Sequence, residues 1–360
     1  MVGIVGQFAE AGSASHKVLA SAEYFLHSLD VKAASFVFIP TSRARLSQLS
    51  FIDGRDDVGL GRESVEVSIG EVFAWHSQHL DRGYENPEPH RFVFHTSFCG
   101  STLMSRVFDI DGKCLTYREP QILLQLAEIK AKNHELYCDK QQWRVLVSFI
   151  LDQFKLAWSD GQVNVIKPSN WGNSIIAELA SNGESAKVVL LSMSEKNFLQ
   201  AAFRGGGERL QYLYSALTHL LTAFPEFTAL VETVKQQELD TAEQFSRFAL
   251  ISLKIQQKAF IRLARLLPNQ DIYHCDYERL CEHPQKSFRS ASDVLGLRLT
   301  TKELNESIDR KMSKHSKIND RRYSKSESRL VDQQVWETYQ TSFERSLSWA
   351  KTELNLAEYF

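Results

Sequence analysis

The stretch "FVFHTSFCGSTLMSRVF" (residues 92–108) decides the fold. Three apolar, β-forming residues are followed by a small polar loop, and then by apolar spacing typical of an amphipathic helix beginning near Ser101. Such a strand–loop–helix unit directs backbone N–H groups and the positive end of a helix dipole at one point, which favours phosphate binding. Gly100 allows close approach, but Ser101 stands where a nucleoside-triphosphate enzyme carries lysine. The alternative is an ordinary turn capped by Ser101.

Short apolar, β-rich runs recur along the chain, at 91–95, 113–117, 163–167, 187–192 and 271–275. Segments with helical apolar spacing lie between them. This alternation predicts βαβ units, and therefore an α/β fold: a phosphate-loop-type open parallel β-sheet flanked by helices in three α/β/α layers. The carboxyl ends of parallel strands form one edge, where the ligands of such sheets bind. We expect that edge to carry four short segments, namely 95–100, 118–120, 167–170 and 192–194.

Composition limits the classes of function. The chain has 360 residues, 43% of them hydrophobic, and a net charge of −2, which gives no general attraction to nucleic acid or to a membrane surface. No apolar stretch approaches the roughly 20 residues that span a bilayer, and the N-terminus lacks the pattern of a secretory signal. Five scattered cysteines are typical of reduced thiols. We expect a cytoplasmic protein with a small-molecule partner, no nucleic acid and no membrane.

Three parts are predicted along the chain. Residues 1–88 form an N-terminal α/β segment or subdomain, 89–330 the phosphate-loop domain, and 331–360 a C-terminal helix packed on it. Within the first part, apolar spacing predicts helices over 17–29 and 66–80, and a strand over 34–40. The three glycines at 205–207 indicate either a hinge over the site or a plain connection between two helices.

Several motifs together resemble a known family. "TSFCGSTLMSRVFD" (96–109) is similar to the 5′-phosphosulfate loop of the sulfotransferases. "LTYREP" (115–120) resembles the second strand of that family and the loop after it, and 272–297 its fifth strand and helix. The resemblance covers roughly residues 90–330 and is to a divergent bacterial-type member. It implies PAPS (3′-phosphoadenosine-5′-phosphosulfate) as the donor substrate, with no metal required. The implied donor-binding loop residues are Thr96, Ser97, Cys99, Gly100, Ser101 and Thr102.

The resemblance accounts for the missing lysine, because the sulfuryl donor has no γ-phosphate and needs no magnesium. Three positions depart from the family pattern. Phe98 stands where the loop usually has a cation, and Met193 and Ala201 align with residues that hold the donor's 3′-phosphate. Either other residues have taken over these roles, or the nucleotide is different, or transfer activity has been lost.

Replacement cations are available. Lys167 ends a strand at the ligand-binding edge and is predicted to stabilise developing negative charge, with Ser169 and Asn170 beside it; the alternative is a lysine that only extends to solvent. The segment 310–325 holds seven cationic residues and one acidic residue. The family clamps the donor with a basic C-terminal segment, so Lys317, Arg321 and Arg322 are our candidates. The alternative is a solvated charge run.

Glu119 is the predicted general base, since transfer to an alcohol needs the hydroxyl proton removed as the bond forms, and a carboxylate at the strand edge near the loop can accept it. Arg118 is predicted to orient Glu119 or to bind an anionic substrate, and the alternative is a structural Arg–Glu pair. His95 and His134 are weaker candidate bases. The leading function is therefore sulfuryl transfer from PAPS to a hydroxyl or amine acceptor. The other candidates are a non-catalytic P-loop protein that binds a nucleotide or a partner, and a phosphotransferase.

Overall fold

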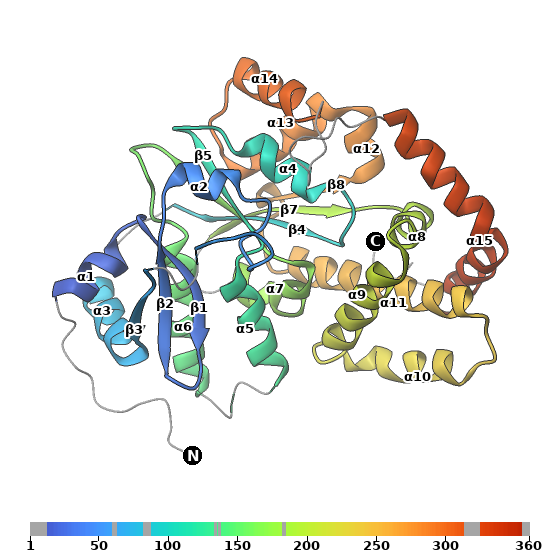
Figure 1. Cartoon of the computed structure of the whole chain (residues 1–360), viewed down its shortest axis with the longest axis horizontal. Helices are drawn as coiled ribbons and strands as arrows, with labels where there is room; N and C mark the ends of the chain where they lie inside the picture. Colours follow the sequence, from blue (N-terminus) through green and yellow to red (C-terminus); the bar gives the residue numbers. More distant parts are fainter. Residues whose placement is uncertain are drawn as a thin grey trace.

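A parallel five-stranded sheet forms the centre of the computed structural model (Figure 1), which describes residues 13–59, 63–81, 88–132, 135, 138–181, 185–312 and 325–354. The strand order is β5-β6-β4-β7-β8, and every neighbouring pair is parallel. The strands are β4 (His90–His95), β5 (Cys114–Arg118), β6 (Val163–Lys167), β7 (Ala186–Ser192) and β8 (Ile272–Asp276). All five lie at the predicted positions, and the predicted α/β fold is confirmed.

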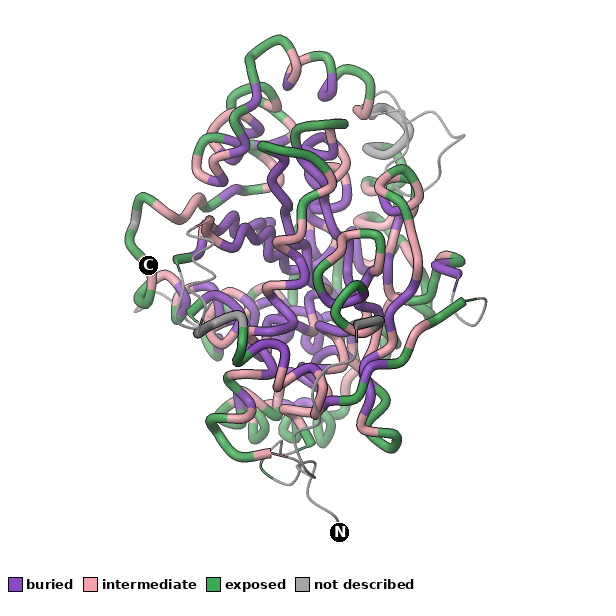
Figure 2. Tube along the Cα trace, turned by 90° about the vertical axis from the view of Figure 1, so that its left-hand side faces the viewer, coloured by how far each residue is buried: buried purple, intermediate pink, exposed green. Residues whose placement is uncertain are grey.

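The apolar runs form this sheet because both of its faces are covered. Every residue of β4, β5 and β6 is buried. Helices α4, α13 and α14 lie over one face, and α5, α7 and α11 over the other (Figure 1). Their bounds are α4 (Ser101–Phe108), α5 (Gln121–Ala131), α7 (Ile176–Ala180), α11 (Thr241–Ala264), α13 (Pro284–Leu295) and α14 (Thr301–Met312). Buried residues run continuously through the interior (Figure 2).

The remaining helices extend the molecule beyond the sheet. They are α6 (Lys140–Gln153), α8 (Glu195–Phe203), α9 (Gly206–Leu220), α10 (Thr228–Gln236), α12 (Tyr277–Glu282) and α15 (Lys325–Glu353), with 3-10 turns η2 (Asn170–Ile175), η3 (Pro225–Phe227) and η4 (Asn269–Asp271). Helix α15 packs on α8, where the Phe203 ring lies 4.8 Å from Tyr339 and 4.9 Å from Phe343. The glycine run lies where α8 meets α9, as a connection between two helices. No helix in the described part of the chain is long and apolar enough to cross a bilayer.

The N-terminal part forms its own antiparallel sheet of β1 (Tyr24–Asp30), β2 (Ser35–Pro40) and β3 (Val65–Ser68), with α1 (Ser13–Ala20), α2 (Arg43–Gln48) and α3 (Ile69–Asp81). The strand predicted over 34–40 is confirmed. The helix predicted over 17–29 is wrong in its second half, which is β1. Pairing with β2 overrides the helical spacing there. The helix predicted over 66–80 likewise begins as β3.

Arg118 ties this N-terminal part to the central sheet. Its side chain is fully buried, and all three guanidinium nitrogens donate hydrogen bonds. One bond goes to the Asp109 carboxylate at 2.8 Å, and the others go to the backbone carbonyls of Leu46, Ser47 and Leu49 at 2.7 to 2.9 Å. Arg118 therefore holds the end of α2 against the end of β5.

Replacing Arg118 tests this role. We expect Arg118→Met to lower the free energy of unfolding by about 3 to 5 kcal/mol, because it leaves buried polar groups without their partner. The measurement is urea unfolding followed by circular dichroism. The control is Lys302→Met, which removes an exposed pair 4.0 Å from Glu306 and should change stability by no more than about 0.5 kcal/mol. Equal effects of the two substitutions would contradict the structural role of Arg118.

Candidate active site

The loop between β4 and α4 has an unusual backbone. Ser97, Phe98 and Gly100 have positive φ angles of 76°, 56° and 82°. For a non-glycine residue this conformation costs of the order of 1 to 3 kcal/mol, so the surrounding structure must hold it in place. A glycine adopts it freely. Left-handed residues before a helix curl backbone N–H groups into a concave anion-binding surface.

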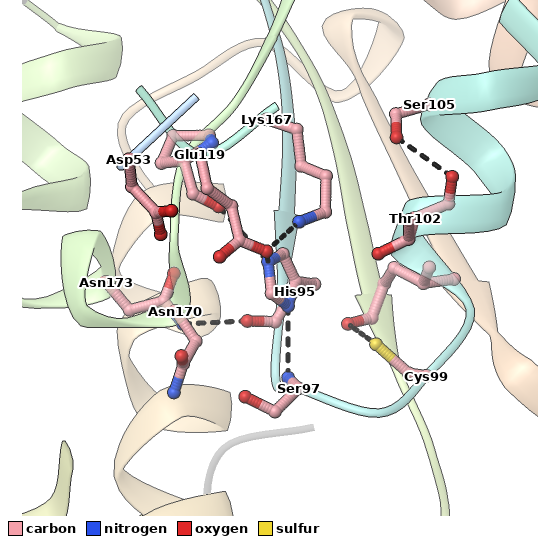
Figure 3. Close-up of polar contacts among 12 residues, drawn as sticks. Asp53, His95, Ser97, Cys99, Thr102, Ser105, Glu119, Lys167, Asn170 and Asn173 are labelled. Carbon is pink, nitrogen blue, oxygen red and sulfur yellow. Dashed lines mark hydrogen bonds and ion pairs between the residues drawn. The ribbon is translucent and has the colours of Figure 1, made fainter. Parts of the chain in front are cut away.

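The first turn of α4 is open. Gly100 is the N-cap residue, and no side chain caps the helix, so the first N–H groups have no side-chain acceptor. Ser101 and Thr102 are buried, and neither hydroxyl makes a hydrogen bond with the described residues. Thr102 projects from α4 toward Lys167 (Figure 3). The alternative in which Ser101 caps an ordinary turn is therefore not what the structure has.

Buried polar side chains support the loop from behind. The Ser97 N–H donates to His95 Nδ1 at 3.1 Å, and His95 Nε2 lies 3.1 Å from the Pro168 carbonyl, which requires a proton on Nε2. The Asn173 amide donates to the His95 carbonyl and to Gln256 Oε1, both at 3.0 Å. His95 thus has a supporting role in this geometry, with both ring nitrogens engaged.

Cys99 is also structural. It is fully buried, and its thiol donates to the Leu191 carbonyl of β7 at 3.3 Å. Burial raises the pKa of this thiol to about 11, so it stays neutral and is a poor nucleophile. Among the residues that the structure describes, no three His, Cys, Asp or Glu side chains come together in a way that could hold a metal ion.

A buried ion-pair cluster lies beside the loop. Lys167, at the end of β6, has no exposed surface, and its ammonium group pairs with Glu119 Oε1 (Figure 3). Glu119 Oε2 pairs with Arg55, whose Nε also contacts both Asp53 oxygens at 2.8 Å. His95 Nε2 lies 3.9 Å from Glu119 Oε1. The strand ends thus bring two predicted residues, Lys167 and Glu119, together next to the loop.

The charges in this cluster act on one another. Burial alone would raise the pKa of Glu119, but the positive charges of Lys167 and Arg55 outweigh it and hold that pKa at about 2. Burial lowers the pKa of Lys167, and the Glu119 carboxylate opposes that shift. Glu119 has a left-handed φ of 56°, which is uncommon for a non-glycine residue and follows directly on the end of β5 at Arg118.

The other predicted residues lie elsewhere. Arg118 contacts Asp109 and not Glu119, so the Arg–Glu pair considered from the sequence does not form. Met193 and Ala201, the two positions where the sequence departs from the family's 3′-phosphate-binding residues, are both buried and apolar. Lys317, Arg321 and Arg322 fall outside the described residues, as does His134.

Sequence reasoning missed the N-terminal contribution. Asp53 and Arg55 reach the cluster because the Ile52 N–H donates to the Arg118 carbonyl at 2.8 Å, and the Ile52 carbonyl accepts from the Gln121 N–H at 3.2 Å. The Arg55 guanidinium also lies 3.6 Å from the centre of the Phe51 ring. No local motif marks this segment.

Tyr212 of α9 was missed as well. Its hydroxyl donates to Asn170 Oδ1, although the residue as a whole is 37% exposed. The Asn170 Nδ2 group is buried and has no hydrogen-bond partner among the residues that the structure describes. Asn170 was predicted to add hydrogen bonds at this edge of the sheet. Tyr212 is 42 residues away from it in sequence, and only the tertiary fold brings the two side chains into contact.

No protein-family model matches the sequence, and no curated protein matches it. Solved structures do match. A sulfotransferase domain from the curacin biosynthetic pathway is 13% identical over 73% of this chain and 98% of that chain, with a TM-score of 0.38. A sulfotransferase from Alicyclobacillus acidocaldarius is 14% identical over 62% and 92%, with a TM-score of 0.34. A sulfotransferase domain from the olefin synthase of Synechococcus PCC 7002 is 15% identical over 71% and 95%, with a TM-score of 0.38. All three carry the name of the family that the sequence motifs resemble.

The pKa of Glu119 predicts an acid-dependent loss of stability. Its folded-state pKa, about 2, lies below its ordinary value of 4.5, so the ionised carboxylate stabilises the fold above pH 4.5 and this contribution is lost as the pH falls toward 2. We expect wild type to exceed Glu119→Gln in stability near neutral pH, and this difference to narrow below about pH 4.5. Urea unfolding of both proteins across the acid range measures it. A difference that stays constant with pH would show that the carboxylate does not have this depressed pKa.

Proposed function

We propose that this protein binds PAPS at the 96–102 loop and transfers its sulfuryl group to a small hydroxyl or amine acceptor. One observation carries the proposal: an uncapped, lysine-free phosphate-type loop lies beside a buried lysine–glutamate pair. The loop's N–H groups and the Ser101 and Thr102 hydroxyls suit the 5′-phosphosulfate. The resemblance of the loop sequence to the sulfotransferases supports the same ligand.

A phosphotransferase fits the residues less well. The first turn of α4 has no lysine for a β- or γ-phosphate, and β7 ends at Ser192 where such enzymes place a magnesium-binding aspartate. Lys167 comes from a different strand and already has a carboxylate partner. A donor that needs neither metal nor γ-phosphate is consistent with each of these features.

The proposed reaction is an in-line displacement at sulfur. The acceptor oxygen or nitrogen forms a bond to sulfur while the bond from sulfur to the bridging phosphate oxygen breaks, and adenosine 3′,5′-bisphosphate leaves with that electron pair. The acceptor's proton passes to Glu119. The Lys167 ammonium and the loop N–H groups stabilise the charge that develops on the leaving phosphate.

In the ligand-free geometry Lys167 and Glu119 are not yet available for these roles, because each neutralises the charge of the other. A carboxylate with a pKa of about 2 is a weak base at neutral pH. The polyanionic donor attracts Lys167 away from Glu119, and a Glu119 relieved of that charge has a higher pKa and accepts a proton more readily. Donor binding would therefore activate the base.

The mutual neutralisation of Lys167 and Glu119 also favours a second candidate, a non-catalytic nucleotide-binding protein. In that case the pair is a structural contact between the ends of β5 and β6, and the loop binds a nucleotide without turnover. Both candidates predict that the loop binds the nucleotide, and only the first predicts transfer of the sulfuryl group.

Binding is tested by calorimetric titration with adenosine 3′,5′-bisphosphate, run beside ADP and AMP. We expect the bisphosphate to bind most tightly. Thr102→Val should weaken it about tenfold or more, because a hydroxyl bond to a charged oxygen is lost.

The matched control is Ser105→Ala on the same helix. The Ser105 hydroxyl donates internally to the Thr102 carbonyl at 3.0 Å, so its loss should leave the affinity nearly unchanged. A preference for ADP or AMP would point to another nucleotide, and absence of binding to all three would remove the basis of the proposal.

Turnover separates the two candidates. We expect wild type to release or transfer radiolabelled sulfuryl from PAPS with a panel of small alcohols, phenols and amines, with water as the reference acceptor. Glu119→Gln should lower this rate about 10²- to 10⁴-fold, the usual contribution of a general base. It should bind the bisphosphate at least as tightly, since Lys167 loses a competing carboxylate. Wild-type binding without any turnover would favour the non-catalytic candidate.

A further inference from the structure

Arg209 of α9 lies against the loop although it is far from it in sequence. Residues 96–102 contain no lysine or arginine. The half-buried Phe98 ring instead packs on Phe198 of α8, with ring centres 5.8 Å apart. The guanidinium carbon of Arg209 lies 4.8 Å from the centre of the same Phe98 ring. A cation from α9 thus stands next to a loop that has none of its own.

Two further features hold Arg209 in this place. One guanidinium nitrogen donates to the Ala201 carbonyl near the end of α8 at 2.5 Å. The side chain also packs directly over Gly205, where an added Cβ would lie 2.1 Å from Arg209 Nε. Gly205 has a negative φ, so its backbone conformation does not require glycine. A side chain at this position would instead collide with Arg209. The first glycine of the 205–207 run therefore serves to seat this arginine.

Arg209 has no carboxylate partner within the described part of the chain. Burial lowers the pKa of Arg209, and the positive charge of Arg204 lowers it further. Arg204 itself pairs with Asp332 at 2.9 Å, so the carboxylate available there is already engaged. A half-buried guanidinium without an anionic partner is partly desolvated, and a bound anion would compensate its charge.

We propose that Arg209 binds an oxyanion of the ligand held by the 96–102 loop and takes the place of a cation within the loop. The guanidinium fork suits phosphate or sulfate oxygens, and stacking on Phe98 fixes its plane. This inference rests on the proposed function for the identity of the ligand, but its test separates the two.

The first experiment removes the charge. Arg209→Gln should weaken adenosine 3′,5′-bisphosphate about 10- to 100-fold in calorimetric titration of the full chain, as expected for one charge-assisted contact. The matched control is Arg262→Gln. Arg262 also stacks on a phenylalanine, Phe224, at 4.6 Å, but it has its own carboxylate in Glu226 at 2.8 Å. Arg262→Gln should leave affinity unchanged.

The second experiment displaces Arg209 without removing it. Gly205→Ala should move the flexible side chain off its seat and weaken binding to a similar extent. The control is Gly207→Ala, where an added Cβ meets nothing within 4 Å. At Gly207, inside α9, alanine favours the helix over glycine. Gly205 is the N-cap of α9, where alanine has no such advantage, so thermal unfolding checks that both variants fold.

Pyrophosphate serves as a second probe. If bisphosphate binding is lost in Arg209→Gln and Gly205→Ala but kept in both controls, the inference stands. If the bisphosphate binds Arg209→Gln as it binds wild type, the inference fails while the proposed function survives. If wild type binds pyrophosphate but does not bind the bisphosphate, and Arg209→Gln loses the pyrophosphate binding, then Arg209 is an anion-binding residue and the proposed nucleotide is wrong. Absence of binding to both probes overturns both proposals.

Discussion

The rest of the site depends on the burial of one ammonium group. Lys167 has no exposed surface, and a charge in such a place requires a partner of opposite sign. Glu119 provides the negative charge, and its backbone is left-handed at this position. The Glu119 N–H also donates to the Lys167 carbonyl at 2.7 Å, so backbone and side chain join the same two strand ends. Arg55 then compensates the second carboxylate oxygen, which brings the N-terminal part of the chain to the edge of the central sheet.

A buried pair of this kind differs from a surface salt bridge in how it responds to a ligand. Its charges are screened little by solvent, so on the proposed function an arriving polyanion would compete directly for the lysine. The loop offers the second half of the attraction through backbone dipoles, which need no partner in the free state because they are partial charges at a helix end. On the proposed function, fixed dipoles and one exchangeable ion pair would together replace the lysine that this loop lacks.

Much of this arrangement was predictable from the sequence, for physical reasons. Parallel strands covered on both faces appear as short apolar runs, so all five were found, and their carboxyl ends identified Lys167 and Glu119 as neighbours. Arg118 was misassigned because successive strand side chains point to opposite faces, which sends it to Asp109. Residues 24–29 satisfied both helical and strand spacing, and only pairing with β2 decides between them. Arg55 and Arg209 reach the site through contacts between distant segments, and no spacing within the chain encodes those.

The hydrogen bonds of Ile52 to the Arg118 carbonyl and the Gln121 N–H have a consequence for specificity. They attach the segment around Arg55 to the sheet through backbone atoms, in addition to the Arg55–Glu119 ion pair, and this backbone part of the attachment does not depend on the identity of the side chains. On the proposed function, β4, its loop and α4 would hold the nucleotide, whereas Arg55 comes from a separate part of the chain and contacts Glu119. A related protein could then change its acceptor by altering this short segment while its donor chemistry stayed the same. On that function, the residues that hold the donor and those that select the acceptor would come from different parts of the chain.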